Sequence, residues 1–198
     1  MQRKVISIGS PNYRLKKMAR LCADRRRILD VGWAVWPNVY MRNAEVIGLD
    51  LQKGRLPKNY TSCVIGDVMT LPEPFEPDSF DALVAGEIIE HLESPLDFLR
   101  RCYKTLKPGG LLVLSTPNPF FPAELLLTIT LSRRYYYTQE HVCLYPQRWL
   151  IRLMERAGLT DVKLYSGGVP APIVGRIPFP RTWCYETIAT GEKQSLTV

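Results

Sequence analysis

The sequence predicts an α/β protein with an open, mostly parallel sheet and helices on both of its faces. Short apolar runs alternate along the chain with amphipathic segments of helical period. The runs are continuously apolar, as expected for strands that helices cover on both sides. Repeated strand, helix and strand units favour right-handed crossover connections within one sheet. The chain has 198 residues, 46% of them apolar, which suits one domain with its own core.

Five strands are expected in the first part of the chain, at residues 27–32, 45–50, 61–67, 80–85 and 110–115. The strongest helix signal lies between the last two of them. Ser94 suits an N-cap and Pro95 the first helical position, and an apolar stripe of helical spacing follows. Pro108 is expected to stop this helix. A second helix is expected from residue 146 to 157, ending at Gly158.

A basic helix is predicted near the start, within residues 10–25. Residues 1–27 carry nine basic side chains and one acidic side chain, whereas the rest of the chain carries seventeen basic and eighteen acidic ones. The leader therefore carries a charge of +8 and the nearly neutral body −1, which together give the net charge of +7. Such a leader suits nucleic acid, an acidic membrane surface or an anionic substrate, and it suits equally a helix face that is simply solvated.

Two segments depart from the alternation, at residues 118–145 and 169–182. The first is rich in apolar and aromatic residues. In the second, the prolines between residues 169 and 180 predict a stiff loop. Both segments follow expected strands, so both are expected to overhang the sheet edge at which α/β proteins bind ligands.

Four expected strands in a row deliver an acid to that edge, namely Asp30, Asp50, Asp67 and Glu87. Clustered carboxylates repel one another, and a cationic or hydroxyl-rich ligand would relieve that cost. Asp50 lies twenty residues after Asp30, where a carboxylate accepts from the hydroxyls of a ribose. The turn after Asp30 contains one glycine, Gly32, which is too few for a phosphate cradle. The expected ligand therefore carries ribose and little or no phosphate.

These segments resemble the ordered motifs of class I S-adenosylmethionine-dependent methyltransferases over about residues 27–168. The matching segments are Leu29-Asp30-Val31-Gly32, Gly48-Leu49-Asp50, Gly66-Asp67-Val68, Phe80-Asp81, Glu87-Ile88-Ile89-Glu90-His91-Leu92 and Leu106-Lys107-Pro108-Gly109-Gly110. The resemblance implies a three-layer αβα sandwich whose seven-stranded, mostly parallel sheet ends in an antiparallel strand pair. Residues 160–165 and 182–190 are candidates for that pair. It also implies one methyltransferase domain over residues 1–198, with a cofactor-binding core at 27–117 and acceptor-side segments at 118–145 and 169–182.

The resemblance also implies roles for the residues at the strand ends. Gly32 would let the methionine part of S-adenosylmethionine approach the backbone, and Asp30 would hold its amino group. Asp50, with Leu51 beside it, would bind the ribose, and Asp67 and Val68 would bind the adenine. Glu87 would line the methionine side. S-adenosylmethionine carries ribose and a cationic sulfonium and no phosphate, as the acids alone suggest.

One departure from the family pattern lies in the turn after Gly32. The family usually has two further glycines there, where this chain has Ala34 and Trp36. Trp36 is too bulky for a position that needs a bare backbone. Either the turn is re-routed with Trp36 beside the cofactor, or cofactor binding is weakened, and the second case would describe a catalytically inactive binding protein.

His91 is the first candidate for a catalytic base and His141 the second, since an oxygen acceptor must lose a proton and imidazole accepts one near neutral pH. A local packing role for His91 is the alternative. Together with Glu87 and Glu90, the two histidines resemble the metal-binding set of small-RNA 3′-end and quinone-biosynthesis methyltransferases. Relatives with a similar motif and no metal leave the presence of an ion open.

The predicted function is transfer of a methyl group from S-adenosylmethionine, with S-adenosylhomocysteine as product, to an oxygen of a small molecule or glycoconjugate. An RNA methyltransferase is the principal alternative, and the neutral body and the lack of a visible RNA-binding module weigh against it. The sequence shows no apolar stretch long enough to span a bilayer and no signal peptide, so a cytoplasmic protein is expected. Peripheral membrane contact through the apolar residues 120–131 stays open.

Overall fold

A seven-stranded mixed sheet forms the centre of the protein in the computed structural model, which describes residues 12–130, 141–171, 175–178 and 180–195. Its strands lie in the order β3-β2-β1-β4-β5-β9-β6. Their bounds are β1 Arg27–Val31, β2 Glu45–Asp50, β3 Ser62–Ile65, β4 Phe80–Gly86, β5 Leu106–Pro117, β6 Thr160–Ser166 and β9 Glu186–Glu192. The first five are mutually parallel, and β9 runs antiparallel to both β5 and β6. The predicted fold class is confirmed.

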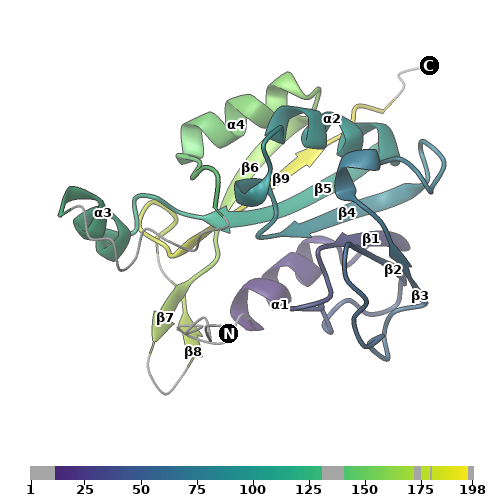
Figure 1. The fold of residues 1–198 in the computed structure, drawn as a ribbon, viewed down its shortest axis with the longest axis horizontal. Coiled ribbons are helices and arrows are strands. Elements are labelled where there is room, and N and C mark those ends of the chain that lie inside the picture. The colour runs from purple at the N-terminus through teal and green to yellow at the C-terminus, as the bar shows by residue number, and fades with distance from the viewer. Residues whose placement is uncertain (1–11, 131–140, 172–174, 179, 196–198) are drawn as a thin grey trace.

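Helices cover the two faces of this sheet unequally (Figure 1). α2 (Pro95–Thr105) and α4 (Gln147–Arg156) lie on one face, and α1 (Asn12–Leu21) lies on the other. The single-turn 3-10 helices η1 (Val68–Thr70) and η2 (Ile89–His91) follow β3 and β4. Residues 32–44, between β1 and β2, contain no helix, so turns complete the α1 side.

The core explains why the strands read as continuous apolar runs. Neighbouring residues such as Ile28 and Leu29 are both buried but belong to opposite faces of the sheet. Leu29 packs in the cluster that includes Phe98 and Leu99 of α2, and Ile28 packs in the cluster that includes Met18 of α1. The side chains at alternating positions along a strand point to opposite faces, and those on both faces are therefore apolar.

The end of α2 differs from the expectation. The helix ends at Thr105, and Leu106 already pairs with Phe80 of β4 as the first residue of β5. The pairing resumes at Ala82 and Leu111, so residues 107–110 bulge out of the ladder. Gly109, with φ of 75°, lies in this bulge. Pro108 therefore lies within β5 rather than at the end of the helix.

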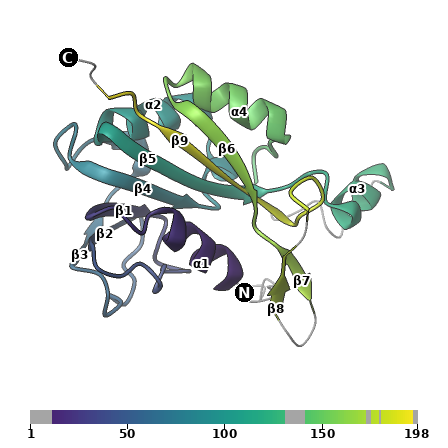
Figure 2. The same ribbon diagram turned by 180° about the vertical axis from the view of Figure 1, so that it is seen from behind.

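The prediction of a stiff loop for the proline-rich segment is wrong in part, because the segment also forms a pair of strands. β7 (Val169–Ala171) pairs antiparallel with β8 (Gly175–Ile177), away from the main sheet (Figures 1 and 2). Both strands of a two-stranded ribbon are edge strands, which tolerate proline, and Pro170 lies opposite Arg176 in this pair. The last strand likewise begins at Glu186 and not at residue 182.

The acceptor-side segment 118–145 is described in part. α3 (Pro122–Ile129) follows β5 and projects beyond the helical layers (Figures 1 and 2). Leu125, Leu126 and Ile129 on this helix are exposed, as is Phe120 just before it. The Arg133 to Tyr137 run lies outside the described residues, as do residues 1–11 of the basic leader.

Candidate cofactor and active site

The four strand-end acids come from four adjacent strands. β3, β2, β1 and β4 are consecutive in the sheet and parallel, so Asp67, Asp50, Asp30 and Glu87 all lie at its carboxyl edge. Asp50 ends β2, and Glu87 directly follows the last residue of β4. The sheet therefore places the acids side by side, as the order of the motifs suggested.

Asp30 is the most enclosed of these acids, with 4% of its surface exposed. Its Oδ2 accepts a short hydrogen bond from the Tyr60 hydroxyl. Burial raises the pKa of Asp30 to about 7, against the opposing effects of Tyr60, the Asn38 amide and the charge of Arg14. The carboxyl therefore changes charge close to neutral pH.

Asp50 and Asp67 each organise the loop that follows them. Asp50 Oδ2 accepts from the Ala34 amide and Oδ1 from the Gln52 amide, both at 2.9 Å. Asp67 caps η1 by accepting from the Met69 amide at 2.8 Å. Asp67 is exposed at the surface, whereas Val68 beside it is buried in the core. Leu51, next to Asp50, is 69% exposed.

The turn after β1 shows how the two tryptophans are accommodated. Gly32 has φ of 72°, and a Cβ added there would lie 2.1 Å from Ile88 Cδ1. Trp33 is buried, and its ring lies over the backbone of Gly48 and Gly54, where added Cβ atoms would approach it within 3 Å. Trp33 thus fills core volume under the turn.

Trp36 instead lines a narrow crevice with about 10 Å³ of open space, together with Gly32, Asp30 and Arg14. The ring is 49% exposed, which places it at the surface of the crevice rather than in the core. The turn thus carries Trp36 at the rim of the crevice, and the effect of this residue on cofactor binding stays a prediction.

Arg14 on α1 is a site residue that the sequence analysis missed. Its guanidinium is 3.1 Å from Glu87 Oε1, 3.5 Å from Glu186 Oε2 and 2.8 Å from Ser115 Oγ. It also lies within 3.3 Å of where a Cβ on Gly86 would stand, at the end of β4. The available signal was spacing, because Arg14 precedes the inward-facing Met18 by four residues and so shares its face.

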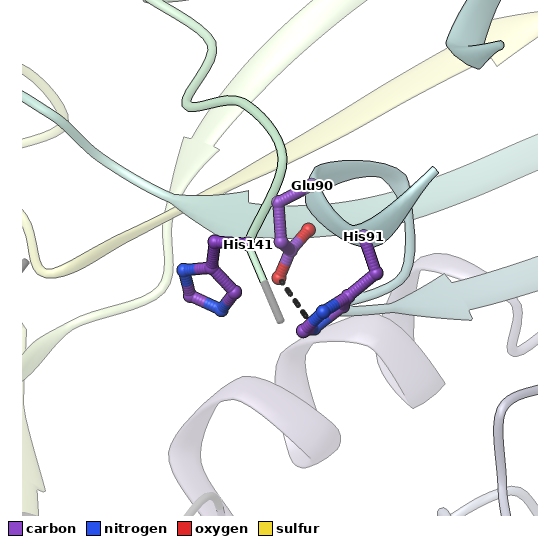
Figure 3. A group of neighbouring side chains, drawn as sticks. All are labelled: Glu90, His91 and His141. Atoms are coloured by element: carbon purple, nitrogen blue, oxygen red, sulfur yellow. Dashed lines mark ion pairs between the residues drawn. The ribbon is translucent and has the colours of Figure 1, made fainter. Parts of the chain in front are cut away.

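A second cluster lies beside the first and consists of Glu90, His91 and His141. One ligand atom from each residue lies within 4.8 Å of the others. The two imidazole ring centroids are 4.7 Å apart, and His91 Nε2 is 3.9 Å from Glu90 Oε1 (Figure 3). The Val142 amide donates to the Glu90 carbonyl oxygen at 2.7 Å, which draws His141 to the end of β4. Glu87 points to Arg14 and does not join this cluster.

Glu90 is fully buried in this cluster. Its Oε2 accepts from Thr116 Oγ1 at 3.0 Å, whereas its Oε1 has no hydrogen-bond partner among the described residues. Burial, followed by the charge of Glu87, raises the pKa of Glu90 well above its ordinary value. A cation or a protonated imidazole near Oε1 would oppose that shift.

The model of a methyltransferase domain family matches residues 11–164. The chain belongs to the S-adenosylmethionine-dependent methyltransferase family. The match covers β1 to β5 and both clusters described above. The cofactor of the family is S-adenosylmethionine, as the strand-end acids suggested.

Curated relatives of this methyltransferase include several ubiquinone biosynthesis O-methyltransferases, including one from Aliivibrio fischeri and one from Cereibacter sphaeroides. The one from Aliivibrio fischeri is 32% identical over an alignment of 104 residues, which covers 47% of this chain and 44% of the relative. The one from Cereibacter sphaeroides is 34% identical over 116 residues, 58% of this chain and 41% of the relative. The chain thus spans less than half the length of these relatives.

Solved methyltransferase structures share the fold across nearly the whole chain. A methyltransferase from Thermotoga maritima, described as a possible histamine N-methyltransferase, has a TM-score of 0.74 at 17% identity and covers 93% of this chain and 89% of its own. A 1,6-didemethyltoxoflavin-N1-methyltransferase from Burkholderia thailandensis, with bound S-adenosylhomocysteine, has a TM-score of 0.67 at 15% identity, covering 98% and 82%. These likenesses concern the fold.

Among the described residues, the methyltransferase has no helix of sufficient length and apolar character to cross a membrane.

Proposed function

We propose that this methyltransferase transfers the methyl group of S-adenosylmethionine to a hydroxyl oxygen of a small, partly apolar acceptor. The observation that carries the proposal is the placement of two different clusters at one sheet edge. One cluster, around Asp30, Glu87 and Arg14, suits a zwitterionic cofactor. The other, formed by Glu90, His91 and His141, suits deprotonation of an acceptor.

The first cluster matches the charges of the cofactor group by group. In the proposed complex the ribose hydroxyls donate to Asp50, and adenine is held by Asp67 and the Val68 amide. Arg14 supplies a buried cation for the methionine carboxylate, because it lies beside Gly86 and lines the same crevice as Gly32. Asp30 and Glu87 are the anions available to the ammonium group and the sulfonium.

The second cluster supplies the proton acceptor that an oxygen nucleophile needs. In the proposed step the acceptor oxygen attacks the methyl carbon in line with the bond to sulfur. The O–C bond forms, the C–S bond breaks, and its electron pair neutralises the sulfonium, giving S-adenosylhomocysteine. The hydroxyl proton passes to the imidazole of His91. The protein contributes alignment and exclusion of water.

The residues of this cluster also fit a divalent cation. Two imidazoles and a carboxylate form an accepted donor set for such ions. An ion would also satisfy the buried Glu90 Oε1, which has no hydrogen-bond partner among the residues that the structure describes. Glu90, His91 and His141 would then hold the metal. A bound divalent ion would supply Lewis-acid polarisation of the acceptor hydroxyl.

The acceptor side of the molecule favours an apolar acceptor. α3 begins five residues after Pro117, the last residue of β5, and exposes Leu125, Leu126 and Ile129. Thr116, near the end of the same strand, contacts Glu90. The O-methyltransferase names of the curated relatives support an oxygen acceptor.

The experiment follows S-adenosylhomocysteine formation with a series of 4-alkylcatechols, with and without EDTA. We expect turnover with at least one catechol, and His91→Gln should lower kcat about 10²–10⁴-fold, the usual contribution of a positioned base, with little change in cofactor affinity. Loss of turnover in EDTA and its recovery with Mg²⁺ would assign the cluster to a metal. His91→Gln with unchanged kcat would contradict the proposed base. Methyl transfer to total RNA and to no catechol would contradict the acceptor class.

A further inference from the structure

The segment between β1 and β2 contains a buried polar side chain, Asn38, which is 1% exposed. Its Nδ2 donates to the Leu15 carbonyl oxygen of α1 at 3.0 Å, and its Oδ1 accepts from the Tyr40 amide at 3.2 Å. Its carbonyl oxygen accepts from Asn59 Nδ2 at 3.1 Å. Asn38 therefore connects α1, the turn that contains Trp36, and the residues that precede β3.

Tyr60 extends this network to the candidate cofactor site. Its hydroxyl oxygen accepts from the Asn38 amide at 2.9 Å, and its hydroxyl proton is donated to Asp30 Oδ2. The ring is 5% exposed and lies 5.6 Å from the ring of Trp33, centroid to centroid. The hydroxyl is thus fixed in direction, with its donor aimed at the carboxylate of Asp30.

We propose that Tyr60 is a positioning residue that keeps the Asp30 carboxylate ionised for the ammonium group of the cofactor, which makes cofactor affinity depend on pH. This inference rests on the proposed function, because it takes Asp30 as a partner of S-adenosylmethionine. Tyr60 lies in none of the motifs through which the family was identified, and it acts only through Asp30.

The electrostatic surroundings of Asp30 set the direction of the effect. Burial raises its pKa to about 7, and the hydrogen bond from Tyr60 is the largest opposing influence. Arg14 of α1 also favours the ionised form, whereas Asp50 at the end of β2 disfavours it. Cys22, just after α1, also faces Asp30, and burial raises the pKa of its thiol to about 12. Arg14 and Cys22 therefore keep one charge state while Asp30 titrates.

Cofactor affinity is expected to fall at low pH. Below the pKa of Asp30, binding of an ammonium group must displace a proton from the carboxyl, so affinity falls as pH falls, approaching tenfold per unit. Loss of the Tyr60 hydroxyl removes a bond to the ionised form and raises the pKa of Asp30 further. We take one such charge-assisted bond as about one pKa unit.

The experiment is calorimetric titration of S-adenosylhomocysteine into the full chain between pH 6.0 and 8.0. Wild-type affinity should rise about tenfold over this range, since one proton is displaced. Tyr60→Phe should bind about tenfold more weakly at pH 6.0, with the deficit narrowing to about twofold at pH 8.0. Tyr103→Phe is the matched control, because Tyr103 lies on α2 at the distant helical layer, and it should follow the wild type.

Two results would overturn the inference and leave the proposed function standing. One is a wild-type affinity that does not change with pH, and the other is a Tyr60→Phe deficit that is equal at every pH, as a purely structural role would give. If Tyr60→Phe does not fold by circular dichroism, Asp30→Asn provides the second test, because its affinity should lose the pH dependence. Absence of binding by the wild type at every pH would instead contradict the proposed function itself.

Discussion

Arg14 is the one buried cation among the acids at the carboxyl edge of the sheet, within the part of the chain that the structure describes. Burial opposes its charge, but Glu186 and then Glu87 outweigh that penalty and raise its pKa. Buried ions of this kind persist only when each has its counter-charge, because desolvation is costly for both signs. The side chain that we assign to the cofactor carboxylate therefore also holds α1 to β9 and β4.

Replacement of Arg14 should expose this structural role. Arg14→Met leaves Glu87 and Glu186 without their cation, so the free energy of unfolding in urea should fall by about 3–5 kcal/mol. The double variant with Glu186→Gln should recover part of that loss. Arg20→Met is the control, since Arg20 is exposed on the same helix and its loss should cost little. Equal stability of the Arg14 and Arg20 variants would contradict the role.

At the scale of single residues, the sequence predicted the strand-end acids. It could not predict the residues that hydrogen-bond to them from elsewhere in the chain. Asp30, Asp50 and Glu87 follow from where apolar runs end, which is local information. Tyr60 comes from a loop before β3 and contacts Asp30 across thirty residues. Nothing in its neighbours encodes that contact, because it depends on how β3 is placed beside β2 and β1.

The helices differ in what they contribute to the fold. Leu99 of α2 is fully buried against the sheet, whereas Leu125 of α3 is 41% exposed on a helix that projects from the body. α2 therefore contributes to the core, whereas α3 leaves apolar side chains exposed.

This difference predicts unequal costs for the same substitution. Leu99→Ala should lower the free energy of unfolding by about 2–5 kcal/mol, from lost burial and a residual cavity. Leu125→Ala should change it by less than about 0.5 kcal/mol. Chemical denaturation of both variants is the measurement, and comparable losses in the two would show that α3 packs into the body.

Element boundaries were predictable where the hydrophobic pattern of the sequence was clear. β1, β2 and β4 lie within a residue of their expected bounds, because burial on both faces imposes a continuous apolar run. The start of β5 was misplaced because the Pro108 and Gly109 signal marks a bulge here, and a bulge and a helix stop use the same residue types. The β7–β8 pair was missed since prolines are allowed at the edges of a two-stranded ribbon.

The narrow crevice beside Trp36 is lined by residues that come from several elements. The crevice holds about 10 Å³ of open space, which is narrow beside the volume of a nucleoside. Trp36 is half exposed and comes from a turn rather than from a helix or strand. Trp36 therefore lies outside the core that packs against the sheet, whereas Trp33 is part of it.

In the whole molecule, the sheet order brings distant segments into one site. The acids of β3, β2, β1 and β4 lie in spatial sequence, while β9 returns Glu186 to Arg14 on the first helix. The predicted fold followed from the resemblance to a family, and residues 160–165 and 182–190 were placed near their observed strands. The joining of α1 to β9 is a property of the assembled molecule that no local pattern carries.

The most direct test of the central claim, that the strand-end acids bind S-adenosylmethionine, is calorimetric titration of S-adenosylhomocysteine into the full chain at pH 8.0. We expect one molecule bound per chain, and a loss of on the order of 1–3 kcal/mol of binding free energy in Asp50→Ala, the worth of a charge-assisted bond. Asp97→Ala, at an exposed acid of α2, should bind as the wild type does. No binding by the wild type, or equal affinity in Asp50→Ala, would contradict the account.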